Sequence, residues 1–165
     1  MATKLTRRQF LGRAGAIGAA AGFAPFLARP VARAAVEAGT GPPVLPAGDF
    51  HMTVGSDGNL WVAEYVANTI RQLAPTGEVS AFAVPSPASA PSDLTAGPDG
   101  SVWFTEENGN RIGRITVSGE ITEFPVPTPA SEPAFIAAGP DGNLWFAETA
   151  ANRIGRITTA GSFAE

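Results

Sequence analysis

The sequence has no cysteine, a single histidine and no long apolar run, and each shortage narrows the possible classes of protein. Without cysteine the chain holds neither disulfides nor thiolate metal sites, so packing alone must stabilise it. No window beyond residue 34 has a helical period, which argues against an α-helical domain. No apolar stretch is long enough to cross a bilayer comfortably.

Basic residues gather at the start of the chain. Arg7 and Arg8 precede an Ala/Gly-rich run over residues 12–27, and Ala32-Arg33-Ala34 provides a small-x-small cleavage signal. This order predicts a twin-arginine signal peptide over residues 1–34, removed on export to the periplasm or the extracellular space. An amphipathic helix or a membrane anchor is the alternative, but the run is interrupted and only weakly apolar.

Beyond residue 34 the charge balance reverses, because five basic residues face fifteen acidic ones, for a net charge of about −10. Such a surface repels phosphate backbones, and no basic patch with interleaved aromatics offsets it, so we expect no nucleic-acid partner. Residues 35–46 are rich in glycine and proline without an apolar period, which predicts a flexible leader. We expect no membrane contact once the signal is removed.

One phrase occurs three times in the rest of the chain. Gly55, Gly97 and Gly139 open the copies GSDGNLWVAEYVANTIRQLA, GPDGSVWFTEENGNRIGRIT and GPDGNLWFAETAANRIGRIT, and the copies follow one another every 42 residues without a gap. A fixed period of this size is typical of propeller blades or solenoid turns.

Turn and strand signals inside the unit favour four-stranded antiparallel blades. Gly-Pro-Asp-Gly supplies proline at the first central turn position and glycine at a positive φ angle. We expect strands over Phe135–Ala138, Leu144–Glu148 and Arg153–Ile157, and a fourth strand over Ile121–Phe124 in the middle unit. Strands that are apolar on both faces need cover on both sides, which stacked sheets supply. The predicted fold class is therefore all-β, a β-propeller.

The number of copies is small for a closed ring. Residues 47–165 hold two full units and part of a third, whereas a closed propeller needs about four blades or more. Two blade faces would then stay uncovered. We therefore expect a fragment, a truncated gene product, or self-association through the open blade faces.

The wording of the repeat resembles the streptogramin lyase (virginiamycin B lyase) family. The likeness rests on G-P-D-G-x-L-W-F-x-E, then N-R-I-G-R-I-T, then G-x-I-T-E-F-P-x-P-T-P, over about residues 51–165. It implies a seven-bladed propeller whose members open a macrocyclic peptide lactone by magnesium-dependent elimination. A carbon–oxygen lyase with Mg²⁺ as cofactor, and a small-molecule or peptide ligand at the channel mouth, follow from the resemblance.

Elimination of an ester needs a base that takes a proton beside a carbonyl, and an electrophile for the charge that develops. The resemblance implies catalytic histidines directly after the proline of Pro-His-x-Ile stretches. In this sequence those positions hold Phe50, Ser92 and Ala134, so the histidine slot is empty in every unit present.

The only histidine, His51, lies one residue after that slot, level with Asp93 and Phe135 in the next two copies. Because this position differs between copies, the shared packing does not dictate it. His51 could therefore serve as the catalytic base at a strand entrance near the central channel. An exposed histidine at a domain edge is the alternative.

Glu64, Glu106 and Glu148 close the second strand of each unit. The resemblance implies that one glutamate of this type helps to hold the metal, and three carboxylates converging on an axis would suit Mg²⁺. Alternatively, each glutamate caps backbone N–H groups at the following turn, or pairs with Arg111 or Arg153. The aspartates of the Gly-x-Asp-Gly turns are interpreted as turn formers, and the three tryptophans as packing between blades.

Two other functions compete with a lyase. A non-catalytic exported binding or scaffold module fits the empty histidine slots and the nearly identical units. An inactive gene fragment fits the small number of units.

Overall fold

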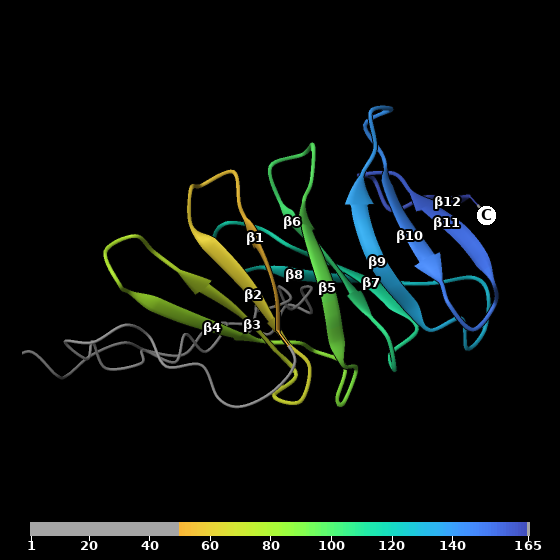
Figure 1. The fold of residues 1–165 in the computed structure, drawn as a ribbon, viewed down its shortest axis with the longest axis horizontal. Coiled ribbons are helices and arrows are strands. Elements are labelled where there is room, and N and C mark those ends of the chain that lie inside the picture. The colour runs from red at the N-terminus through yellow and green to blue at the C-terminus, as the bar shows by residue number, and fades with distance from the viewer. Residues whose placement is uncertain (1–49, 165) are drawn as a thin grey trace, which may run out of the picture.

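The computed structural model describes residues 50–164, which form three antiparallel sheets, here called blades 1 to 3 (Figure 1). Blade 1 contains β1 (Phe50–Val54), β2 (Leu60–Glu64), β3 (Thr69–Leu73) and β4 (Val79–Ala83). Blade 2 contains β5 (Pro91–Ala96), β6 (Val102–Glu106), β7 (Arg111–Ile115) and β8 (Ile121–Pro125). Blade 3 contains β9 (Pro133–Ala138), β10 (Leu144–Glu148), β11 (Arg153–Ile157) and β12 (Phe163–Ala164).

Each sheet is a meander in which every strand pairs with its neighbour in sequence. The predicted strands Leu144–Glu148 and Arg153–Ile157 are confirmed residue for residue, and the other two are longer by one or two residues. The tight turn is also confirmed, because Gly142 has a φ of +76° and its N–H donates to Gly139 O over 3.1 Å. The predicted signal peptide (1–34) and leader (35–46) lie outside the described residues.

The three blades stand side by side like an opened fan, with β1, β5 and β9 adjacent at the inner edge (Figure 1). The outer strands β4, β8 and β12 point away from that edge. The prediction of an all-β partial propeller is confirmed. No helix in the described part of the chain is long and apolar enough to cross a membrane.

Two apolar seams hold neighbouring blades together. The seam between blades 1 and 2 packs Trp61, Ala63, Ile70, Phe82 and Val84 against Leu94, Val102, Phe104 and Ile115. The seam between blades 2 and 3 repeats it with Trp103, Ile112 and Val126 against Ile136, Leu144, Phe146 and Ile157. Trp61 and Trp103 therefore pack between blades, as predicted, and burial of the large apolar side chains in these seams contributes about 1.5–3 kcal/mol each.

Seam residues of blade 2 have counterparts on blade 3 that are exposed, because no described blade follows blade 3. Ile112 is fully buried in the seam behind blade 2, whereas its counterpart Ile154 on blade 3 is 61 % exposed. Trp103 is likewise buried and Trp145 is 37 % exposed. The outer side of blade 3 is thus an apolar seam surface without a described partner; we call it the open face of blade 3.

A cross-strand pair of phenylalanine and glycine fills the space between β6 and β7, and between β10 and β11. Phe104 lies opposite Gly113, and Phe146 opposite Gly155. A Cβ atom on Gly113 would lie 2.1 Å from Phe104 Cζ, so the ring occupies the place of a side chain. Blade 1 replaces this pair by Val62 opposite Arg71, a smaller side chain opposite a larger one.

In blades 1 and 2, an asparagine after the second strand fixes the connector to the next blade. Asn110 Nδ2 donates to Val126 O and Thr128 O, and its Oδ1 accepts from the N–H and the hydroxyl of Ser131. Asn68 makes the same contacts to the connector that precedes blade 2. Both have a positive φ, which asparagine tolerates better than most residues. We call this arrangement the asparagine clamp.

Candidate functional site

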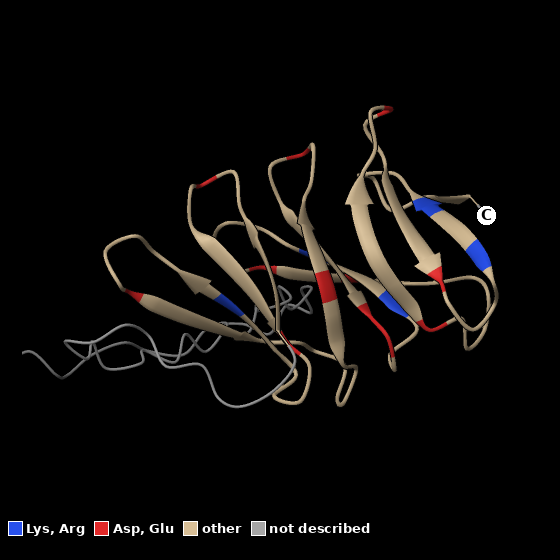
Figure 2. Ribbon diagram, viewed as in Figure 1, with Lys and Arg blue, Asp and Glu red and all other residues tan. Residues whose placement is uncertain are grey.

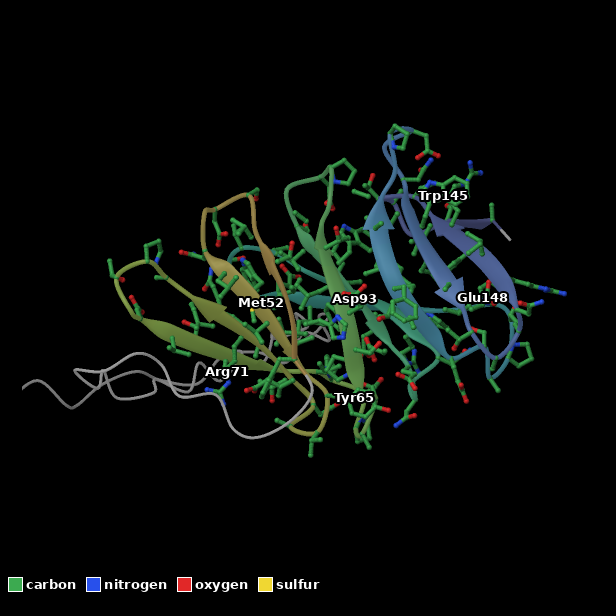
Figure 3. The ribbon with its side chains drawn as sticks, in the orientation of Figure 1. Met52, Tyr65, Arg71, Asp93, Trp145 and Glu148 are labelled. Atoms are coloured by element: carbon green, nitrogen blue, oxygen red, sulfur yellow. The ribbon has the colours of Figure 1, made fainter. Side chains whose placement is uncertain are left out.

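The inner strands carry the three residues at the position of His51, and two of their side chains meet. His51 Nδ1 on β1 lies 3.3 Å from Asp93 Oδ1 on β5. Asp93 Oδ2 accepts a hydrogen bond of 3.0 Å from the backbone N–H of Ile136 on β9, directly after Phe135. One carboxylate therefore joins three blades at their inner edge, where Figure 3 labels Asp93 between the neighbouring strands.

A β-bulge explains why Asp93 reaches both neighbours. The register of β5 against β6 shifts between Pro91 and Leu94, so two residues oppose Thr105 alone. The Thr105 hydroxyl is buried and satisfies the irregular backbone, since it accepts from Asp93 N and bonds to the Ser92 hydroxyl. Bulges redirect side chains and recur beside functional sites. β1 has no such shift, and His51 simply pairs with Ala63.

Phe135 is the third member of this row, and its backbone is unusual. The register of β9 also shifts, and Phe135 adopts a φ of +50° with its ring 68 % exposed. A bulky residue in the left-handed region is an outlier that costs about 1–2 kcal/mol and is found most often at functional positions. His51, Asp93 and Phe135 thus form the candidate site.

The three predicted metal ligands are buried, one in each blade. Glu64, Glu106 and Glu148 are each exposed by 1 % or less at the end of β2, β6 and β10. Glu64 pairs with Arg71 Nε over 2.7 Å, an arginine that the sequence reasoning did not select. The carboxylate oxygens of Glu148, labelled in Figure 3, have no hydrogen-bond partner among the described residues.

Glu106 is a carboxyl group in an unfavourable place for charge. Burial, and then the nearby charge of Glu123, raise the pKa of Glu106 to about 8, although Ser89 and Arg111 act in the opposite direction. Glu106 is therefore protonated at neutral pH, and a cation that bound there would have to displace a proton.

Magnesium takes oxygen ligands, and the buried carboxylates have the right chemistry. Their geometry is less favourable, since residues 50–164 contain no group of three or more His, Asp and Glu side chains placed to hold a metal ion. A site on one of these glutamates would have to complete its ligands with water, substrate or residues beyond this set.

The turn aspartates have the structural role expected of them. Trp145 Nε1 donates to Asp141 Oδ1 over 3.0 Å, and the same bond joins Trp103 to Asp99. Hydrogen bonds from Asn143 and Trp145 lower the pKa of Asp141 to about 2. Figure 2 shows most acidic residues in such turns and at strand ends, whereas β5 and β8 each carry one within the strand.

A pocket of about 310 Å³ lies on the open face of blade 3. It is lined by Ala147, Glu148, Thr149, Asn152, Arg153 and Ile154. In blades 1 and 2 the equivalent asparagine holds a connector, so this pocket marks an unfilled asparagine clamp. The pocket includes one predicted site residue, Glu148.

Asp93 is the site residue that sequence reasoning missed as a functional group. The sequence identifies Asp93 only as the counterpart of His51, because nothing in the sequence shows that equal repeat positions on adjacent inner strands come into contact. The sequence signal for this site is that unlike residues, His51, Asp93 and Phe135, occupy one position of the 42-residue repeat.

The described segment is an arc of a β-propeller, because its inner strands converge, its blades have four antiparallel strands and its seams repeat every 42 residues. A model of the Virginiamycin B lyase family matches residues 36–165. The chain belongs to the virginiamycin B lyase family.

Three solved structures support this assignment. Virginiamycin B lyase from Staphylococcus aureus is 47 % identical with a TM-score of 0.68, over 69 % of this chain and 39 % of that one. A streptogramin B lyase is 44 % identical with a TM-score of 0.66, over 68 % and 38 % of the two chains. A catalytically inactive S. aureus variant with quinupristin is 44 % identical with a TM-score of 0.70, over 73 % and 41 %.

The chain therefore spans about two fifths of the length of these structures. No match was found among the curated proteins.

Proposed function

We propose that this chain is part of an exported propeller that opens a cyclic peptide lactone by elimination at its C–O bond. The observation that carries the proposal is the 47 % identity to virginiamycin B lyase across 69 % of the chain. The His51–Asp93 contact adds a titratable group at the inner edge, where the blades converge.

The proposed chemistry assigns one role to His51. Its free ring nitrogen takes the proton beside the carbonyl group, the C–H electron pair becomes a C=C bond, and the C–O pair leaves with the carboxylate. Mg²⁺, when bound, supplies positive charge for the carbonyl oxygen as the proton leaves. Glu64, Glu106 and Glu148 remain the candidates for a carboxylate ligand.

Liquid chromatography with tandem mass spectrometry tests the proposal, because retention time and fragmentation distinguish the ring-opened isomer from the cyclic substrate of equal mass. Purified protein, quinupristin and Mg²⁺ should yield a linear product of unchanged mass, because elimination rearranges bonds within one molecule, whereas hydrolysis adds one water. His51→Gln should abolish the product, and Asp141→Asn, an exposed turn variant, should retain it. Absence of ring opening in the unsubstituted protein, with and without Mg²⁺, would overturn the lyase assignment.

A binding module is the second candidate, favoured by one observation. Phe135 presents a ring that is 68 % exposed beside the His51–Asp93 pair, which suits apolar contact with a ligand at the channel mouth. If calorimetry detects quinupristin binding that Phe135→Ala weakens, while no product forms, a binding module replaces a lyase as the proposed function.

We also propose that the open face of blade 3 associates with blade 1 of a second copy. Ile154 and Trp145 are exposed there, and Met52 on β1 is 56 % exposed at the position that fills the seam in blades 2 and 3. Such a head-to-tail contact joins two different faces, so it can extend from copy to copy without forming a closed ring. Sedimentation velocity should show concentration-dependent growth that Ile154→Asp abolishes. Val117→Asp, an exposed apolar residue off that face, should leave it unchanged; growth in both variants would exclude this surface.

Export through the twin-arginine route belongs to the same proposal and rests on the order of residues 1–34. Replacement of Arg7 and Arg8 by lysine should keep the protein in the cytoplasm, and an unchanged distribution between fractions would contradict it.

A further inference from the structure

We propose that Asp93 is a positioning residue that fixes the tautomer and the ring orientation of His51, so that His51 presents a free Nε2 at the inner edge of the propeller. This inference deepens the proposed function and rests on it for its catalytic meaning. Its structural content is independent of any activity.

The two nitrogens of the His51 imidazole have different surroundings. A neutral imidazole carries one N–H, and a carboxylate can only accept a hydrogen bond. Because His51 Nδ1 faces Asp93 Oδ1 at 3.3 Å, the proton of the neutral ring belongs on Nδ1. The lone pair is then on Nε2, which is the nitrogen that can accept a proton from a ligand. Half of the His51 side chain is exposed, so a ligand can reach the ring.

Two backbone N–H groups hold the Asp93 carboxylate in place. Asp93 Oδ1 accepts from the N–H of Leu94 over 2.9 Å, and Oδ2 accepts from the N–H of Ile136 over 3.0 Å. These two donors belong to β5 and β9, so the position of the carboxylate is set by two different blades. The Asp93 side chain is only 22 % exposed, which further limits its movement.

The β-bulge in β5 makes the contact between Asp93 and His51 possible. The shifted register of β5 and the Thr105 hydroxyl hold the backbone of Asp93 in a geometry that the unshifted β1 does not have. The strained backbone of Phe135 adjoins the amide that holds Oδ2. Two irregular strands thus orient one carboxylate toward the only histidine of the chain.

As a consequence for catalysis, Nε2 is the nitrogen of His51 that acts as the base. When Nε2 takes the substrate proton, the resulting imidazolium is stabilised by the Asp93 carboxylate at Nδ1, and the carboxylate keeps its own charge. The proton then passes to solvent. Without Asp93 the ring would rotate and exchange tautomers, and only part of the population would have its basic nitrogen directed at the substrate.

The single histidine makes the inference directly measurable. Long-range ¹H–¹⁵N NMR of the whole chain, labelled on imidazole nitrogen and recorded at alkaline pH, reports which nitrogen carries the proton, with no assignment needed. We expect the Nδ1–H tautomer to predominate in the unsubstituted protein. Asp93→Asn and Asp93→Ser should shift the ring toward the Nε2–H form, and Asp141→Asn should not.

Kinetics separates the two proposals. If the lyase reaction is found, Asp93→Asn should lower kcat at least 10-fold with KM changed less than 3-fold, since the proposed role of Asp93 is exerted through His51. If the Asp93 variants show the expected tautomer shift but the unsubstituted protein opens no lactone ring, the positioning role is retained and the lyase function is excluded. Predominance of the Nε2–H form in the unsubstituted protein, or an unchanged tautomer in both Asp93 variants that fold by circular dichroism, would overturn the positioning role.

Discussion

The asparagine clamp predicts a large difference in stability between two substitutions that look identical in sequence. Asn110 and Asn152 occupy the same repeat position with φ values of +52° and +54°. Asn110 is clamped to a connector, whereas Asn152 is exposed in the pocket of blade 3 and holds no connector among the described residues. Asn110→Ala and Asn152→Ala therefore share the backbone cost and differ in the clamp.

The magnitude follows from the four hydrogen bonds of Asn110. Two go to Val126 O and Thr128 O at 3.3 and 3.0 Å, and two come from Ser131 N and Oγ at 2.8 and 2.9 Å. At about 0.5–1.5 kcal/mol each, and with Ser131 left buried and unsatisfied, the clamp contributes about 3 kcal/mol. The loss of asparagine at a left-handed φ adds about 1 kcal/mol to both variants.

Urea unfolding followed by tryptophan fluorescence measures the difference. Asn110→Ala should lower the free energy of unfolding by about 3 kcal/mol more than Asn152→Ala does. Asn68→Ala, at the other clamp, should behave like Asn110→Ala. A gap below about 1 kcal/mol between Asn110→Ala and Asn152→Ala would refute the clamp as a stabilising device.

Three further outcomes are expected. The pKa of Glu106 is about 8 in the folded state and 4.5 in the unfolded chain, so the free energy of unfolding should fall as the pH rises from about 4.5 to about 8. Glu106→Gln should flatten this pH dependence in urea titrations. An equal pH dependence in both proteins would contradict the raised pKa. Phe135→Gly should be about 1 kcal/mol more stable than Phe135→Ala by thermal unfolding, the reverse of the usual order, because only glycine adopts a φ of +50° without strain; the usual order would show that the backbone is unstrained. Gly113→Ala should destabilise the protein by about 2 kcal/mol in urea, since its Cβ would meet the Phe104 ring, and this cost should shrink in a Phe104→Val background.

Most of the blade could be predicted because its signals are local. Glycine and proline at fixed turn positions set the strand ends, and strands such as Leu144–Glu148 and Arg153–Ile157 were therefore placed correctly. The period of 42 residues gave the number of sheets and their order without any tertiary information.

The site could not be predicted in the same way, because it depends on register and on contacts between blades. The bulge at Asp93 arises from the buried Thr105 hydroxyl on the neighbouring strand, and no local pattern indicates it. The partner of Glu64 was missed for a related reason, since Arg71 stands where the other units have the glycine opposite phenylalanine. The clamp contacts of Asn68 and Asn110 could not be predicted either, because their partners lie up to 22 residues away.

The repeated seams also bear on how such genes change. Both seams use corresponding residues at one constant offset, and each clamp grips the connector that directly follows its own blade. Recombination between two copies would therefore delete or add a whole blade while every surviving contact keeps its partner type. A gene of this construction tolerates the gain or loss of 42 codons more readily than the loss of three.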